Sequence, residues 1–317
     1  MLGPTLFNVY YSDVIAEFPH NEITLFADGT AIVASAPKTE ELQVAMQSRL
    51  TRIDEFLQSL NMALNASKTQ ALAIFTESFP DLTVRGQAVQ NCKSFKYLGV
   101  HIDSSLSWDI HAQHVINKVH KNLFVLHRCS GAANIDRRRL LFRAYIYPHF
   151  LYGIELFMHC SVALRAKLEA LFRRCCRLVM RDTGLFHRIT RVSLFSALNV
   201  LPLRLTFQYS SAVILYNVLV LNRVPSLRTL FEVVQATHYN SRRTPPDVIE
   251  LRLPSVNTER ARHNFAYWGA LLWNSLPVEV RRGTTLSVFT RLYLLYLQTK
   301  LEQAIQANDH YSLFEFL

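Results

Sequence analysis

The segment from Leu25 to Val33 constrains the fold of this chain most strongly, because it places an Asp-Gly pair between two apolar runs. Such a pair is the strongest short-range signal for a β-hairpin, since a type I′ turn needs positive φ at both central residues. The pattern therefore predicts strand, turn and strand, with Asp28 and Gly29 as the turn. A carboxylate there is held on a rigid support that suits metal binding. Alternatively, Asp28 only suits the turn.

Further helices and strands are predicted around this hairpin. Pro4 suits the first turn of a helix, whose apolar residues at helical spacing are Leu6, Val9, Tyr10 and Val14. Thr39 can cap a second helix, whose apolar stripe is Leu42, Met46, Leu50, Ile53, Leu57 and Leu60. Residues 65–69 predict a turn into a strand at 71–75, and residues 82–84 and 95–102 predict a second strand pair. This mixture of helices and hairpins indicates an α+β domain.

Four motifs, in this order, resemble the palm of a reverse transcriptase from a non-LTR, LINE-like retrotransposon of the jockey type. The motifs are Leu2–Asn8, Phe26-Ala27-Asp28-Gly29, Asn65–Thr69 and Tyr97-Leu98-Gly99. The family has here a segment that positions template and nucleotide, an aromatic-Ala-Asp-Asp hairpin, an Asn-x-x-Lys-Thr loop and a strand near the primer end. Residues 147–153 resemble the segment that follows the palm in these elements, and residues 238–242 and 272–277 resemble the tail of such an open reading frame. The resemblance implies a partial right-hand polymerase palm, followed by a mainly α-helical thumb and a helical C-terminal region.

The resemblance also implies a polymerase site in which carboxylates hold two Mg²⁺ ions. The family takes one aspartate from an earlier strand and two from the hairpin. Here the earlier strand would lie before residue 1, and Gly29 replaces the second hairpin aspartate. Asp28 is therefore the one catalytic and metal-binding carboxylate that we expect. Because one carboxylate is a poor Mg²⁺ site, we expect weak Mg²⁺ binding and no polymerase activity from this chain alone.

Lys68 is the second catalytic residue that the resemblance implies. In the family, this loop lysine stands near the departing pyrophosphate, where an ammonium group can stabilise charge or donate a proton. The alternative is a solvated lysine beside a turn.

Positive charge is concentrated in the second part of the chain. Residues 1–110 hold 7 Lys and Arg against 12 Asp and Glu, whereas residues 111–317 hold 27 against 12. This asymmetry indicates a polyanionic partner. Two predicted helices hold the candidates for phosphate contact, which are Arg137, Arg138, Arg139, Arg173, Arg174 and Arg177. The resemblance implies that these helices pack along an RNA template and DNA primer, through contacts independent of sequence. An ordinary solvated helix face is the alternative.

Cysteine usage and hydropathy indicate the redox environment of the protein and whether it spans a membrane. The chain has five cysteines without Cys-x-x-Cys or zinc-knuckle spacing. This odd number and the lack of a leader fit a reducing intracellular setting, nucleus or cytoplasm. The longest apolar stretch, residues 212–221, is about half as long as a membrane span requires. We therefore expect no membrane partner.

We predict three parts: a partial palm at 1–108, a helical basic thumb-like region at 109–182 and a mainly helical C-terminal region at 183–317. Three functions stay open. The first is an inactive reverse transcriptase remnant that retains nucleic-acid binding. The second is an active polymerase part completed by a separate upstream chain with the fingers and first aspartate, against which Gly29 argues. The third is a non-catalytic scaffold whose basic helices bind an acidic protein.

Overall fold

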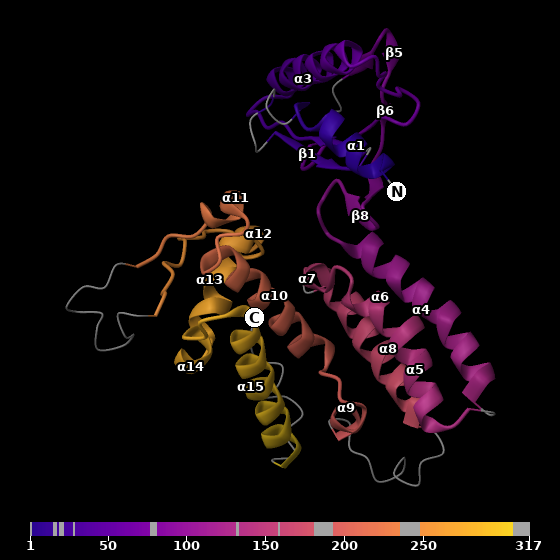
Figure 1. The fold of residues 1–317 in the computed structure, drawn as a ribbon, viewed down its shortest axis with the longest axis vertical. Coiled ribbons are helices and arrows are strands. Elements are labelled where there is room, and N and C mark those ends of the chain that lie inside the picture. The colour runs from indigo at the N-terminus through magenta and orange to yellow at the C-terminus, as the bar shows by residue number, and fades with distance from the viewer. Residues whose placement is uncertain are drawn as a thin grey trace. The chain divides into compact units, whose positions relative to one another are not determined.

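The fold consists of two compact units, residues 1–107 and residues 108–317 (Figure 1). The computed structural model describes residues 2–14, 18, 22–27, 29–76, 81–130, 133–157, 159–180, 193–234 and 248–306. Helices and strands are mixed in the first unit, and helices dominate the second. Each unit is considered below by itself.

Two helices shape the core of the first unit. Helix α1 (Gly3–Tyr11) has Pro4 in its first turn, as predicted. Its apolar stripe differs from the prediction, because Leu6 and Val9 are 61% and 67% exposed, whereas Tyr11 is buried. The reason is the rotation of the helix about its axis, which turns Tyr11 toward the core. The ring of Phe7 stacks on Tyr11 with centroids 5.5 Å apart.

Helix α3 (Thr39–Ser59) confirms the predicted stripe, with Leu50, Ile53 and Leu57 buried. The predicted cap is wrong by one position. Lys38 has the extended backbone of the N-cap, and Thr39 is the first helical residue. Glu40 and Glu41 lie in the first turn, where acidic side chains interact favourably with the helix dipole.

The first hairpin pairs β1 (Ile23–Phe26) with β2 (Gly29–Ile32), with Phe26 opposite Gly29. The predicted turn is therefore wrong at Gly29, which pairs with Phe26 and begins the second strand. Ala27 has a φ of 51°, and Asp28 lies outside the described residues. Strand pairing decides the register, because a slip of one residue would turn every side chain to the opposite face.

Two more hairpins correct the predicted second strand pair. Strand β4 (Thr83–Val84) pairs with β5 (Gln87–Ala88), and β7 (Ser94–Tyr97) pairs with β8 (Val100–Asp103). Residues 82–84 and 95–102 therefore belong to separate hairpins. Both turns have positive φ at both central residues: Arg85 and Gly86 in one, Leu98 and Gly99 in the other. This is the type I′ geometry, which matches the twist of the flanking strands.

A short parallel pair, β3 (Gln70–Ala71) with β6 (Gln90–Asn91), completes the strands described in this unit. The prediction of a strand over 71–75 was too long. Regular pairing ends at Ala71, although the Phe75 amide still donates to the Ser104 carbonyl at 2.9 Å.

The second unit is helical. Its helices are α4 (Asp109–Ser130), α5 (Ile135–Tyr145), α6 (Tyr147–Leu151), α7 (Ile154–Phe157), α8 (Val162–Met180), α9 (Ser193–Leu198), α10 (Leu203–Leu219), α11 (Pro225–Arg228), α12 (Glu259–Arg262), α13 (Phe265–Ser275), α14 (Val278–Arg281) and α15 (Leu286–Gln306). An isolated antiparallel bridge joins Val233 and Leu251. No described helix has the length and hydropathy that a membrane span requires.

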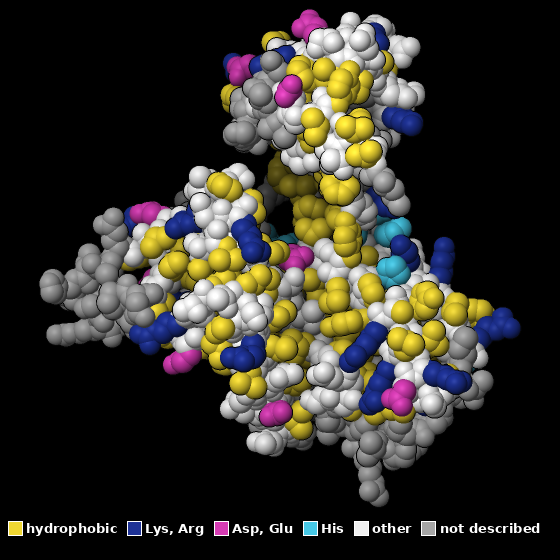
Figure 2. Space-filling view, viewed as in Figure 1, with side chains coloured by type: hydrophobic (Ala, Val, Ile, Leu, Met, Phe, Trp, Pro, Cys, Tyr) yellow, Lys and Arg dark blue, Asp and Glu magenta, His cyan; other side chains and the backbone are white. Residues whose placement is uncertain are grey.

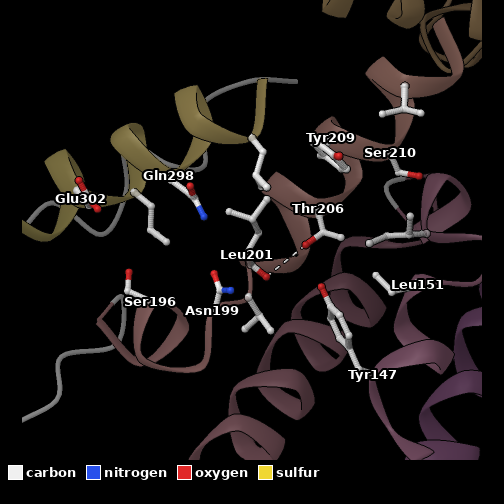
Figure 3. A pocket seen from close by; sticks show the side chains of 15 residues that line it. Tyr147, Leu151, Ser196, Asn199, Leu201, Thr206, Tyr209, Ser210, Gln298 and Glu302 are labelled. Carbon is white, nitrogen blue, oxygen red and sulfur yellow. Dashed lines mark hydrogen bonds between the residues drawn. The ribbon is translucent and has the colours of Figure 1, made fainter. Parts of the chain in front are cut away.

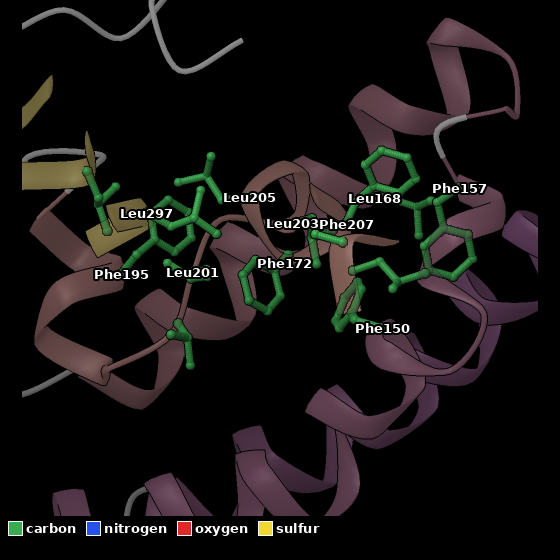
Figure 4. Close-up of a cluster of buried hydrophobic side chains, with 14 of the residues drawn as sticks. Phe150, Phe157, Leu168, Phe172, Phe195, Leu201, Leu203, Leu205, Phe207 and Leu297 are labelled. Carbon is green, nitrogen blue, oxygen red and sulfur yellow. The ribbon is translucent and has the colours of Figure 1, made fainter. Parts of the chain in front are cut away.

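One hydrophobic core runs through this unit, from α4 to α15. Phe172 of α8 lies near its centre, with the rings of Phe150 and Phe195 at centroid distances of 5.0 and 5.8 Å (Figure 4). This core includes side chains on both sides of residue 182. The structure therefore groups the predicted thumb-like and C-terminal regions in one compact unit, and the three-part division stays a prediction.

Candidate nucleic-acid interface

The Asn65 loop holds Lys68 through a side-chain turn. The Asn65 Oδ1 atom accepts hydrogen bonds from the Ser67 hydroxyl at 2.7 Å and the Lys68 amide at 3.2 Å. Its carbonyl accepts from the Thr69 hydroxyl at 2.8 Å. This explains why an Asn stands here, since Asn side chains favour turns by bonding nearby backbone. Lys68 is exposed, and its catalytic role stays a prediction.

Gly29 lies in a conformation that other residues can adopt. Its φ is outside the left-handed region, and an added Cβ would lie 3.2 Å from the Phe26 carbonyl oxygen. A small shift of the turn would therefore admit a side chain. Across the described residues, no group of three or more His, Cys, Asp and Glu side chains could hold a metal ion. The predicted metal ligand, Asp28, lies outside them.

The arginines of α5 have different surroundings from those predicted. Asn134 caps the helix, its Oδ1 accepting from the Arg137 amide at 3.0 Å, and the Arg137 side chain is exposed. Arg138 is only 4% exposed, because it lies on the same face of α5 as the buried Phe142. Arg138 is therefore not part of an exposed basic surface, and its phosphate contact stays a prediction.

Arg139 and its neighbour Arg143 reach the C-terminal end of α9. The Arg139 guanidinium donates to the Ala197 carbonyl at 3.2 Å, and that of Arg143 donates to the Leu198 carbonyl at 3.4 Å. The last carbonyls of a helix lack partners within the helix, and cations there are favourable. These two arginines thus stabilise α9, a role that sequence reasoning missed because the partners lie more than 50 residues away.

Helix α8 presents the clearest basic surface. Its buried side includes Leu171, Phe172 and Cys175. Apart from Val162 in its first turn, the exposed residues of α8 are alanine or positively charged. They form the opposite side, here called the basic face of α8: Ala163, Ala166, Lys167, Ala170, Arg174 and Arg177. Arg173 is half-buried beside this face. The alanines leave the cationic side chains as the only long ones, and the face has no acid.

The acidic residue of α8 lies away from this face. Burial raises the pKa of Glu169, while the charges of Arg173 and Arg204 and a hydrogen bond from the Arg204 amide act to lower it. Because Arg204 lies in the first turn of α10, Glu169 accepts from an amide at that helix terminus, where a carboxylate is favourable. Glu169 therefore leaves the basic face uncompensated. Figure 2 shows several Lys and Arg side chains over the part of the second unit formed by α4, α5 and α8.

A cavity elsewhere in this unit has a different chemistry. It has a volume of about 610 Å³ and lies between α6, α9, α10 and α15, with Tyr147, Asn199 and Thr206 among its lining residues (Figure 3). Burial raises the pKa of Tyr147. No Lys or Arg belongs to the lining, so the cavity does not favour phosphate, and the basic face of α8 is the better candidate.

Comparison with known proteins identifies relatives of this chain. Residues 1–102 match the family described as reverse transcriptase (RNA-dependent DNA polymerase). The "RNA-directed DNA polymerase from mobile element jockey" of Drosophila funebris is 24% identical over 182 residues. The protein of the same description from Drosophila melanogaster is 27% identical over 124 residues. This chain is related to jockey-type reverse transcriptases.

The relationship confirms the resemblance seen in the four motifs, all of which lie within residues 1–102. The two matches cover 53% and 36% of this chain, but they span only 19% and 14% of the lengths of the jockey polymerases. No solved structure shows significant similarity to the chain. The family match thus lies within the first unit, residues 1–107.

Proposed function

We propose that this chain is a jockey-type reverse transcriptase relative that binds nucleic acid without polymerising it. In this proposal, residues 1–108 form part of a right-hand palm, residues 109–182 a thumb-like region and residues 183–317 a helical C-terminal region. The family match over residues 1–102 supports the palm. The basic face of α8 is the observation that carries nucleic-acid binding.

The spacing along α8 suits a phosphate backbone. Lys167 and Arg174 are seven positions apart, or about 10 Å along a helix axis, and Arg177 follows one turn later. Arg174 and Arg177 can each donate two hydrogen bonds to one phosphate through a planar fork. Arg137 on α5 is a further exposed cation. The proposed partners are an RNA template and DNA primer, contacted through their backbones and therefore without regard to sequence.

We propose that the chain does not polymerise nucleic acid because of the sequence of its first hairpin. The relatives' family has two adjacent aspartates at the tip, whereas this chain has Asp28 followed by Gly29. Asp28 and a bound nucleotide can hold Mg²⁺ weakly, but two ions need more carboxylates. An active polymerase part completed by a separate fingers–palm chain is the second candidate, and Gly29 argues against it.

Fluorescence anisotropy with a labelled RNA–DNA template–primer, over a range of salt concentrations, tests the binding. The test variant replaces Lys167, Arg174 and Arg177 with alanine, which favours helix and so preserves α8. We expect weaker binding. The negative slope of log K against log salt concentration should become shallower by about 2 to 3, as for the loss of two or three phosphate contacts.

The matched control replaces three other exposed cations of the same unit, Arg223, Arg262 and Arg291, with alanine. Its net charge equals that of the test variant, and its salt slope should stay near that of the unmodified chain. Equal losses of template–primer affinity in the test variant and the control variant would contradict a specific role for α8. Binding with weak salt dependence, and equally tight to an acidic protein, would favour the scaffold alternative instead.

A further inference from the structure

Two histidines that are far apart in the sequence meet in the second unit. The Nδ1 atoms of His159 and His263 lie 3.2 Å apart, although 104 positions separate the residues in the chain. Their rings are nearly perpendicular, at 86°. His159 follows α7, and His263 lies between α12 and α13. The contact therefore joins two separate parts of the helical unit.

The surroundings hold both backbones in place. The ring of His159 packs against Trp268 and Phe207, with centroids 5.5 and 6.5 Å away. Its neighbour Cys160 is buried. Asn264, directly after His263, caps α13 by accepting a hydrogen bond from the Ala266 amide at 3.0 Å. His159 is half-buried, whereas His263 is exposed. An ion can thus approach the pair from solvent and meet a ring of fixed position.

The contact between the two rings bears on coordination, because a metal ion binds the lone pair of a neutral imidazole. A contact between two Nδ1 atoms requires one nitrogen to donate and the other to accept. The pair thus places one lone pair and one N–H toward each other.

We propose that His159 and His263 form a two-imidazole site for a divalent transition-metal ion such as Zn²⁺ or Cu²⁺. A tetrahedral ion with Zn–N bonds of 2.0–2.1 Å separates two ligand nitrogens by about 3.3 Å, close to the 3.2 Å found here. Coordination requires small ring rotations, and the donating histidine transfers its proton from Nδ1 to Nε2. No proton is released overall, because both rings remain neutral.

The site would be an open one. Within the part of the chain that the structure describes, no cluster of three His, Cys, Asp or Glu ligands exists, so solvent molecules would complete the coordination. Imidazole suits both ions, and Cu²⁺ should bind more tightly than Zn²⁺. The two rings come from segments 104 positions apart, so they form a common site only in the folded chain. An ion bound by both rings should therefore raise the thermal stability of the folded state.

The test uses the whole chain, purified without a histidine tag. Zn²⁺ is titrated while the melting temperature is recorded, and the EPR spectrum of bound Cu²⁺ reports the number of nitrogen ligands. The unmodified chain should show a rise in melting temperature with Zn²⁺ and a spectrum with two imidazole nitrogens. His263→Ala should lose both signals. His263 is exposed, so this variant should still fold.

Two further variants make the result decisive. His120→Ala, an exposed histidine of α4, should behave like the unmodified chain. His263→Cys should restore the Zn²⁺ effect, because a thiolate is also a zinc ligand. If His263→Ala retains the Zn²⁺-dependent rise or the two-nitrogen spectrum, the ion binds elsewhere, the contact is a hydrogen bond only, and the proposal is wrong.

Discussion

Arg85 binds the carboxylate of Asp54 through both its Nε and Nη2 atoms, at 2.8–3.0 Å. Arg85 is the first turn residue of the β4–β5 hairpin, with a φ of 50°, and Asp54 lies on α3. The hydrogen bond from Arg85 is the main cause of a lowered pKa of Asp54, which burial opposes and Gln58 assists. The pair therefore ties a hairpin tip to a helix.

This pair should make the first unit sensitive to acid. The folded-state pKa of Asp54 lies below its ordinary value of 3.8. The pair therefore adds stability above about pH 4, and that stability is lost as the pH falls through the folded-state pKa. Asp54→Ala should lower the free energy of unfolding near pH 7 by about 1–3 kcal/mol, because Asp54 is buried and its partners lose their acceptor. Urea unfolding at pH 7 and pH 3 measures both effects. A variant that remains as pH-dependent as the original chain would contradict this.

His159 should produce a second pH effect in a different range. Its pKa is lowered from 6.5 to about 4, chiefly by burial. Between pH 6.5 and 4 the unfolded chain binds a proton that the folded chain does not bind, so stability falls as the pH is lowered over this range. His159→Asn should flatten this dependence, while His120→Asn, at an exposed position, should not. Melting temperatures recorded across the range, without added metal, test the difference.

Primer extension on an RNA template with Mg²⁺ tests the proposed lack of polymerisation. We expect no product from the unmodified chain, with or without an added fingers–palm fragment of a jockey relative. Gly29→Asp, supplemented with that fragment, should yield product, because the hairpin then has two adjacent carboxylates. The backbone at Gly29 is compatible with a side chain, and Gly29→Asn serves as the uncharged control. Product from the unmodified chain would show that one hairpin carboxylate suffices.

Gly283 should be intolerant of any side chain. An added Cβ would lie 2.9 Å from the Cα atom of Phe289 and 3.0 Å from its nitrogen, and the backbone of α15 cannot move easily around the fully buried Phe289. The Gly283 carbonyl also accepts a hydrogen bond from the buried Tyr216 hydroxyl at 2.9 Å. Gly283→Ala should destabilise the second unit by about 1–3 kcal/mol.

Gly3→Ala is the control for that substitution, because an added Cβ there meets nothing within 4 Å. This change should be neutral or slightly stabilising at the start of α1. Thermal unfolding of both variants makes the comparison. If Gly283→Ala melts at the temperature of the original chain, the close approach of Phe289 is not as tight as the structure indicates.

Several features of the candidate site were predictable because their causes are local. The Asp-Gly pattern predicted the first hairpin, although Gly29 begins the second strand and does not belong to the turn. Asn65 was correctly placed in a turn, since its own side chain makes the bonds. The stripe on α3 was found because residues three and four apart share a helix face. The β7–β8 turn at Leu98 and Gly99 was missed, although Gly99 is a turn signal.

The arginines of α5 and α8 show which features of the structure local sequence patterns do not predict. The helical spacing on α8 correctly separated its apolar side from Arg174 and Arg177, because the stripe is long and regular. On α5 the run of three arginines gave no indication that Arg138 is buried or that Arg139 bonds to α9. Those outcomes depend on which neighbours surround a short helix.

By itself, the sequence determined the relationship to jockey-type reverse transcriptases, the apolar stripes of α3 and α8 and the concentration of positive charge after residue 110. These follow from residue order, helical periodicity and composition. The tertiary structure decided the registers of the hairpins, the burial of Arg138 and the meeting of His159 with His263. Each of these depends on packing between segments distant in the chain, and such contacts form only when the core fixes the rotation and position of every helix.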